Sequence, residues 1–123
     1  MIELDFFDSS NKFGVIKATV HRTGKLGFSS GASKFMNIEN VNFFNIGLNK
    51  VNANDKSLYL VTEKNETDKS FKVVKAGDYY YIFIKNILRE LKIDYKNESI
   101  IYDIEEIENS GQQIFKLTRR ERK

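Results

Sequence analysis

The chain has 123 residues, of which 41% are hydrophobic and 30% are charged, and its formal net charge is +3. These proportions are ordinary for a soluble globular protein, and a chain of this length folds without the help of a metal or a disulfide. The absence of cysteine excludes disulfides, thiolate catalysis and cysteine-based metal sites, and the single histidine excludes a multi-histidine metal site within one chain.

The first 16 residues form an N-terminal extension. The stretch from Met1 to Asp8 is acidic and lacks the basic-then-apolar order of a signal peptide. No apolar run approaches the roughly 20 residues that cross a bilayer, so we expect a cytoplasmic protein with no membrane partner. The stretch from Ile2 to Phe7 could form an extra strand.

Residues 17–64 are predicted to form two strands, a short helix and two more strands. The strand at 17–20 leads to Gly24, where a hairpin turn needs a positive φ angle. Ser29 or Ser30 can cap the short helix that follows. The remaining two strands are predicted at residues 42–48 and 57–62.

Residues 70–120, which follow a polar link, are predicted to repeat the same order. Strands at 71–74 and 79–84 flank Gly77, and a helix is predicted at 85–92, where apolar residues recur at helical spacing. The last two strands are predicted at residues 100–107 and 112–117.

The two halves also align segment by segment, with Lys17–Gly24 matching Ser70–Gly77 and Phe43–Leu48 matching Ser99–Ile104. A four-stranded unit of this size cannot close a good core alone, whereas two such units can close a barrel together. The sequence therefore predicts one domain over residues 1–123 that is mainly β with two short helices. Its fold would be a pseudo-twofold β-barrel made from two β-β-α-β-β repeats.

A family resemblance rests on the run Lys17-Ala-Thr-Val-His-Arg-Thr-Gly-Lys-Leu-Gly-Phe28, on the helix ending Phe35-Met-Asn-Ile38, and on the two strands after it. This pattern resembles the AbrB/MazE swapped-hairpin family, and the resemblance covers both halves. It implies an AbrB-like barrel that two chains normally intertwine to build, and that here a tandem repeat would build from one chain. It also implies a small transcriptional regulator that binds duplex DNA.

The resemblance places the DNA contacts at the first turn and on the short helix of each half. Two departures from the family pattern are Ser29, where the family has proline, and Asp78, which follows the second turn glycine. We expect basic residues of both halves to share one side of the barrel, and the basic tail at 119–123 to add phosphate contacts. The predicted DNA-binding residues are Arg22, Lys25, Lys34, Lys75, Lys85, Arg89, Arg119 and Arg120.

The run from Tyr79 to Phe83 leaves a second possibility open. Strand alternation places Tyr79, Tyr81 and Phe83 on one face and the residues between them on the other. The favoured interpretation is that these aromatic residues belong to the core or to an interface. The alternative is a stacking platform for single-stranded nucleic acid.

A further alternative is a structural or protein-interaction module of a phage or mobile element, which could pair as a homodimer or bind another protein. The sequence predicts no enzyme, because His21 has no identifiable catalytic partners and no paired carboxylates can be defined. The segment Gly24–Gly31 lacks phosphate-loop spacing. We expect no catalytic residue, no metal and no cofactor.

Overall fold

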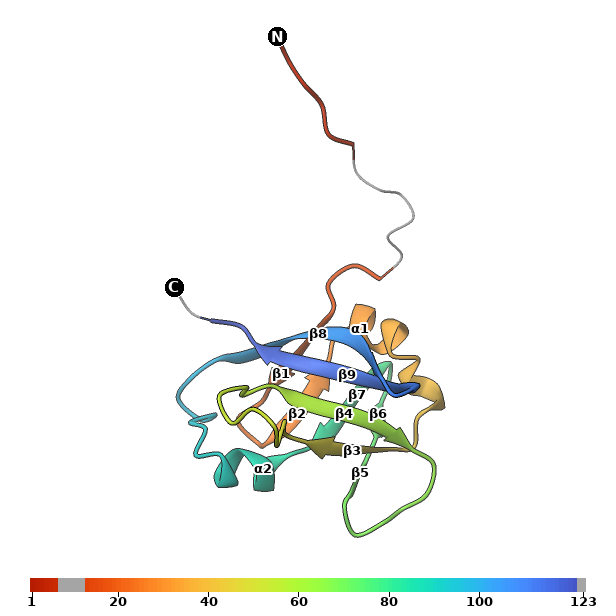
Figure 1. The fold of residues 1–123 in the computed structure, drawn as a ribbon, viewed down its shortest axis with the longest axis vertical. Helices are drawn as coiled ribbons and strands as arrows, with labels where there is room; N and C mark the ends of the chain where they lie inside the picture. Colours follow the sequence, from red (N-terminus) through yellow and green to blue (C-terminus); the bar gives the residue numbers. More distant parts are fainter. Residues whose placement is uncertain (7–12, 122–123) are drawn as a thin grey trace.

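The structure is a computed structural model that describes residues 1–6 and 13–121. It confirms a mainly β fold with two short helices (Figure 1). The elements in chain order are β1 (Lys17–Val20), β2 (Lys25–Phe28), α1 (Ser30–Phe35), the 3-10 helix η1 (Ile38–Asn40), β3 (Phe43–Gly47), β4 (Leu58–Glu63), β5 (Ser70–Lys72), β6 (Val74–Ala76), β7 (Tyr79–Phe83), α2 (Lys85–Glu90), β8 (Ile100–Asn109) and β9 (Gln112–Arg119).

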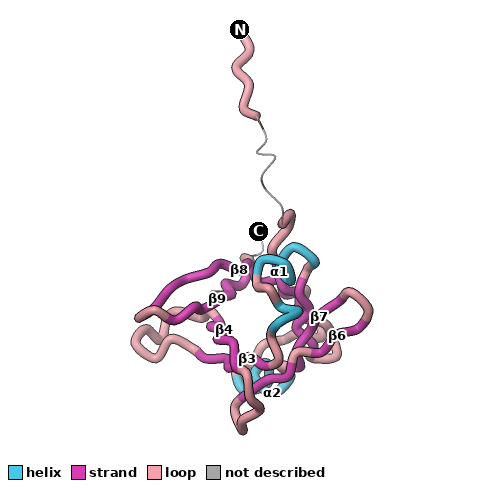
Figure 2. Tube along the Cα trace, turned by 90° about the vertical axis from the view of Figure 1, so that its right-hand side faces the viewer, coloured by secondary structure: helices cyan, strands magenta, loops and turns pink. Residues whose placement is uncertain are grey.

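All strands belong to one antiparallel sheet in the order β5-β3-β4-β9-β8-β1-β2-β7-β6, which curls into a nearly closed barrel (Figure 2). The two edge strands of the sheet, β5 and β6, follow each other in the chain. Strand β5 pairs with β3 at one edge, and β6 pairs with β7 at the other. Val73 lies between them, and its N–H donates to the Asn42 carbonyl at 2.9 Å. The strand that the sequence predicts as one piece is therefore interrupted at Val73 and bridges both ends of the sheet.

The pairing pattern is the same in both halves of the chain. Strand β1 lies between β2 and β8, and the β5–β6 stretch takes the equivalent neighbours, β7 and β3. The hairpins β3–β4 and β8–β9 also correspond, and the pairs β2–β7 and β4–β9 join one half to the other. Strands of the two halves consequently alternate in pairs around the barrel.

One hydrophobic core fills the barrel and takes side chains from both halves. Phe115 of β9 is 1% exposed, and its ring centroid lies 6.0 Å from that of Phe35 on α1. Leu26 of β2 and Ile82 of β7 are fully buried and face each other across the strand pair that joins the halves. Burial of apolar surface in either half therefore requires the other half.

Helix α1 begins against residues 13–15. The Ser29 hydroxyl accepts from the Ala32 N–H at 3.1 Å, which caps the helix, and donates to the Val15 carbonyl at 2.7 Å. Gly31 faces the same segment so closely that a Cβ there would overlap the carbonyl oxygens of Phe13 and Val15. The missing side chain at Gly31 is what allows the backbone to run across the helix.

Replacing Gly31 with alanine should lower the free energy of unfolding by about 1–3 kcal/mol, because the added methyl group meets backbone atoms that must shift. The sign of this change is informative, since replacing glycine with alanine inside a helix ordinarily stabilises the protein by about 1 kcal/mol. Gly47→Ala is the matched control, because a Cβ there meets nothing within 4 Å, and we expect a change within about 0.5 kcal/mol. Urea denaturation of both variants measures the difference, and equal stabilities would contradict the close contact.

Residues 1–6 extend away from the barrel and include no strand (Figure 1). The extra strand expected over Ile2–Phe7 is therefore wrong for the part that the structure describes, because no neighbouring strand lies alongside it to accept its backbone hydrogen bonds. Phe7 lies outside the described residues. Within residues 1–6 and 13–121, none of the helices has the length and apolar content needed to cross a membrane.

Candidate nucleic-acid interface

Four basic residues gather where the β1–β2 turn meets α2. Gly24, with φ of 91°, accepts from the Ile84 N–H at 2.9 Å and packs against the Lys85 side chain. This contact brings Arg22 and Lys25 beside the first turn of α2, and Arg89 follows Lys85 by four residues on the same helix face. We call Arg22, Lys25, Lys85 and Arg89 the turn cluster. None of them forms an ion pair with a residue that the structure describes.

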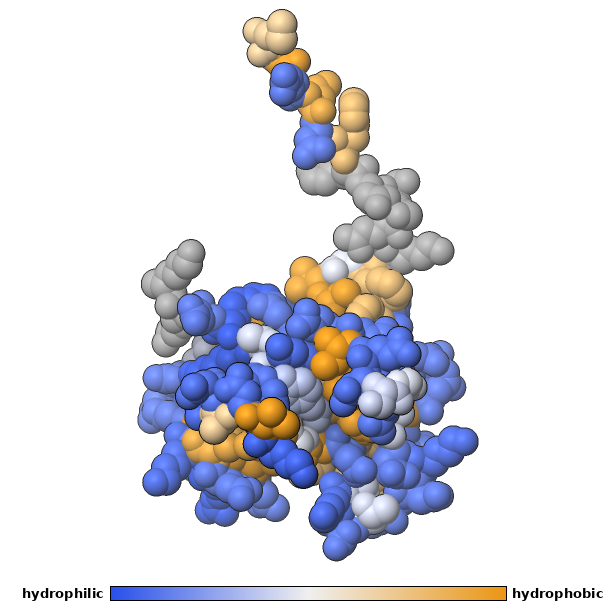
Figure 3. Space-filling view, in the orientation of Figure 1, coloured by the Kyte–Doolittle hydropathy of each residue, from blue (hydrophilic) through white to orange (hydrophobic). Residues whose placement is uncertain are grey.

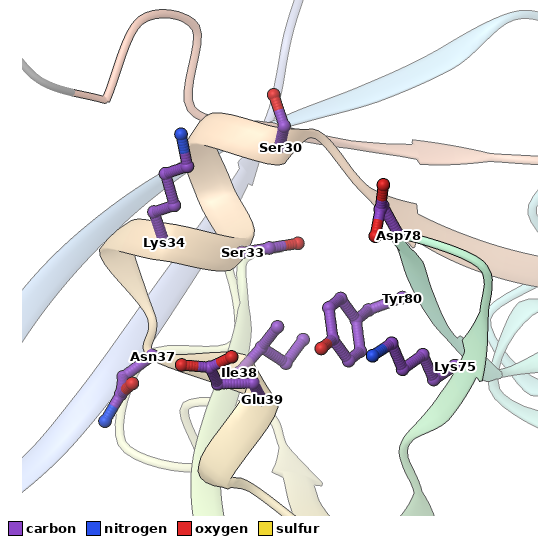
Figure 4. A pocket seen from close by; sticks show the side chains of 9 residues that line it. All are labelled: Ser30, Ser33, Lys34, Asn37, Ile38, Glu39, Lys75, Asp78 and Tyr80. Atoms are coloured by element: carbon purple, nitrogen blue, oxygen red, sulfur yellow. The ribbon is translucent and has the colours of Figure 1, made fainter.

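Lys34 and Lys75, which were predicted to bind DNA together with the turn cluster, lie at the opposite end of the barrel, beside α1 (Figures 1 and 4). The expectation that basic residues of both halves share one side of the barrel is therefore wrong for Lys34 and Lys75. The physical reason is the antiparallel pairing of β2 with β7, in which Lys25 lies opposite Phe83 and Phe28 lies opposite Tyr80. The β1–β2 turn consequently meets α2, which follows β7, and the β6–β7 turn meets α1, which follows β2.

Lys34 and Lys75 line a pocket of about 580 Å³ together with Glu39, Asp78 and Tyr80 (Figure 4). The Lys75 Nζ lies 5.9 Å from the centroid of the Tyr80 ring. The lining holds two carboxylates and two ammonium groups, so the pocket carries no excess of positive charge with which to attract a phosphate. This pocket therefore lacks the net positive charge that a nucleic-acid interface needs.

The arginines at the end of β9 are engaged in ion pairs. Arg119 contacts Glu98 at 2.9 Å, and Arg120 contacts Asp103 at 2.6 Å. The hydrogen bond from Arg120 to Asp103 raises the pKa of the guanidinium further. These partners neutralise the described part of the predicted basic tail, while Arg122 and Lys123 lie outside the described residues.

The aromatic residues of β7 lie on the outer surface of the barrel. Tyr79 is 38% exposed and Phe83 is 52% exposed, whereas Ile82 and Ile84, which alternate with them, are fully buried. The ring centroids of Tyr79 and Tyr81 are 6.0 Å apart, and those of Tyr81 and Phe83 are 5.3 Å apart. The favoured interpretation is that these residues belong to the core or to an interface, and its core part is wrong for Tyr79 and Phe83, because the aliphatic face of the same strand fills the core. The interface part stays a prediction. We call Tyr79, Tyr81 and Phe83 the aromatic ladder.

Tyr79 of the aromatic ladder is held in place by His21, which follows β1, and by Gly27 of β2. The Tyr79 hydroxyl and His21 Nε2 are 2.6 Å apart, and the same hydroxyl crosses Gly27, where any Cβ would overlap it. Burial, and to a smaller extent Tyr81, raises the pKa of Tyr79, so its phenol stays protonated at neutral pH. The arrangement gives His21, which had no partner in the sequence, a structural role in orienting Tyr79.

Lys25 joins the turn cluster to the aromatic ladder. Its Nζ lies 4.5 Å from the centroid of the Tyr81 ring and 5.7 Å from that of Phe83. Cations over aromatic faces are attracted by the ring quadrupole. The result is one continuous surface in which stacking rings lie next to positive charge. This surface depends on the pairing of Lys25 in β2 with Phe83 in β7, and no short motif in the sequence indicates that pairing.

Comparison with protein-family models, with curated proteins and with solved structures finds no match to this chain.

Proposed function

We propose that this protein binds single-stranded nucleic acid on the surface formed by the turn cluster and the aromatic ladder. The observation that carries the proposal is the row of three outward-facing aromatic rings on β7, with Lys25 over two of them. Proteins that bind single strands combine stacking side chains with a positively charged path for the backbone. Both components occur here within one surface.

The balance of forces favours a single strand over a duplex. Each base that stacks on an aromatic side chain contributes about 1–3 kcal/mol, and the bases of a duplex are already stacked on each other. A duplex would therefore use only the cations of the turn cluster and leave the aromatic ladder without a partner. A single strand would use both.

Duplex DNA is the second candidate, and a specific observation favours it. The strands pair in the same way in both halves of the chain. An AbrB-like swapped-hairpin barrel would require this pairing if a tandem repeat of β-β-α-β-β units took the place of two chains. In that case Arg22 and Lys25 would approach the phosphates or base edges of a regulatory site. The protein would then act as a small transcriptional regulator.

The test compares a labelled mixed-sequence oligonucleotide, longer than about 16 nucleotides, with the duplex of the same sequence. Fluorescence anisotropy at about 50 mM and about 200 mM salt gives the affinities and their salt dependence. We expect tighter binding of the single strand, with affinity falling as salt rises. Tighter binding of the duplex would favour the second candidate.

Two double variants with equal loss of charge locate the interface. Arg22→Ala with Lys85→Ala should reduce the slope of log affinity against log salt by about 1.4, from about 0.7 for each lost phosphate contact. Lys34→Ala with Lys75→Ala, at the opposite end of the barrel, should leave the slope unchanged. Equal effects of both double variants, or no binding of either nucleic acid, would refute the proposed interface.

A further inference from the structure

The N-terminal segment, residues 1–6, exposes apolar side chains that a folded chain ordinarily covers. Ile2 and Phe6 are each 84% exposed and Leu4 is 71% exposed, and they alternate with Glu3 and Asp5. Figure 3 shows this alternation of orange and blue side chains along the projecting segment. Such an extended apolar and acidic stretch, about 20 Å long at about 3.3 Å per residue, has the pattern of a segment that docks on another surface.

A groove of about 730 Å³ lies between the loop after β3 and the loop after α2, and we call it the side groove. Its apolar lining comes from Leu48, Leu91 and Ile93, with Tyr102 also part of the wall. Leu48 is 52% exposed although it lies beside these other apolar residues. The side groove therefore presents apolar surface that an extended peptide could cover.

The net charge of the side groove is opposite in sign to that of Glu3 and Asp5 in the N-terminal segment. Lys50, Lys56 and Lys92 line the side groove and are exposed, and none of them forms an ion pair with a described residue. The lining also holds three carboxylates and Arg119, so its net charge is +1, opposite in sign to Glu3 and Asp5. Asp55 accepts from Tyr59 and from the Ser57 N–H, Asp94 accepts from Asn97, and Glu98 accepts from Arg119.

The hydrogen bond from Tyr59, followed by those from Ser57, holds the pKa of Asp55 well below its usual value. Hydrogen bonding to Asp55 also raises the pKa of Tyr59. Asp55 consequently stays anionic and bound to its own loop, and the net positive charge of the lining is what attracts an acidic partner.

We propose that the N-terminal segment of one copy binds in the side groove of a second copy of this chain. Its apolar side chains would cover Leu48, Leu91 and Ile93, and Glu3 and Asp5 would face the lysines. The N-terminal segment leaves the barrel beside α1, whereas Leu91 follows α2 at the opposite end (Figures 1 and 2), which favours the groove of another copy. The contact is heterologous, since each copy offers a segment to one neighbour and a groove to another.

Sedimentation of the full chain without nucleic acid tests this contact, because mixing two variants can restore it. One variant carries Leu4→Glu and Phe6→Glu, and the other carries Leu48→Glu and Lys50→Glu, all at exposed positions. We expect the unmodified chain to associate as its concentration rises, and each variant to associate at least tenfold more weakly. An equimolar mixture of the two variants should form one-to-one dimers and nothing larger.

Val15→Glu is the control, since Val15 is an exposed apolar residue outside both the N-terminal segment and the side groove. This variant should associate like the unmodified chain. A chain that stays monomeric at all concentrations, as it would if the N-terminal segment bound its own groove or another protein, overturns the proposal. A mixture of the two variants that stays monomeric overturns it as well. The result is independent of nucleic-acid binding, which is measured separately.

Discussion

Replacing Tyr81 and Phe83 together with alanine should weaken the binding of a mixed-sequence single strand by about 30-fold or more. Both rings lie on the outer face of β7 next to Lys25, so each offers a stacking position. Two lost stacks at about 1 kcal/mol each, the low end of the range, correspond to this factor. Titration of a labelled oligonucleotide by fluorescence anisotropy measures the change.

The control for this variant removes exposed apolar side chains elsewhere. Leu48→Ala with Val51→Ala affects the loop after β3, well outside the aromatic ladder, and should leave the affinity for single strands unchanged. Thermal unfolding of both double variants should remain close to that of the unmodified chain, since the replaced side chains face outward. Unchanged affinity of the Tyr81 and Phe83 variant would mean that the aromatic ladder does not contact bases.

Phe115→Ala should lower the free energy of unfolding by about 3–5 kcal/mol, because it leaves a cavity at a fully packed site. Phe115 belongs to the second half of the chain and packs against Phe35 in the first half, so the loss should weaken both halves at once. Total stabilities of domains are about 5–15 kcal/mol, so much of the margin would be lost. Urea unfolding, followed by tyrosine fluorescence and by far-ultraviolet circular dichroism, measures the change.

Phe83→Ala is the matched control for stability, because it makes the same chemical change on the outer face of the barrel. We expect it to change the free energy of unfolding far less than Phe115→Ala does, while it still weakens nucleic-acid binding. The two optical signals should report one coincident transition in every variant. Separate transitions for the two halves would contradict a shared core.

The order of strands and helices followed from local patterns in the sequence. β-Branched and aromatic residues on either side of the turns predicted the strands, and glycines at 24 and 77 marked hairpin turns, both of which have positive φ in the structure. The second helix ends at Glu90 instead of the predicted residue 92, because Lys92 takes a left-handed conformation with φ of 57°. Such local backbone choices at a helix end are weakly encoded.

The candidate site followed from the sequence only in part. Basic residues at the first turn and at the start of the second helix were predicted to act together, and Gly24 does bring that turn against Lys85. Lys34 and Lys75 were assigned to the same side, and they lie at the other end of the barrel. Arg119 was assigned to phosphate binding, and it is paired with Glu98 at 2.9 Å. Pairings between distant segments depend on register, which composition and spacing do not specify.

By itself, the amino-acid sequence determined which residues share a strand face, where the chain turns, and that the protein is mainly β with two short helices. Only the tertiary structure decided which face of β7 is buried, since alternation separates Tyr81 from Ile82 without saying which of them points inward. The tertiary structure also decided that the β1–β2 and β6–β7 turns lie at opposite ends of the barrel, because β2 and β7 pair antiparallel. Local patterns arise from neighbours in the chain, whereas a binding surface arises from neighbours in space.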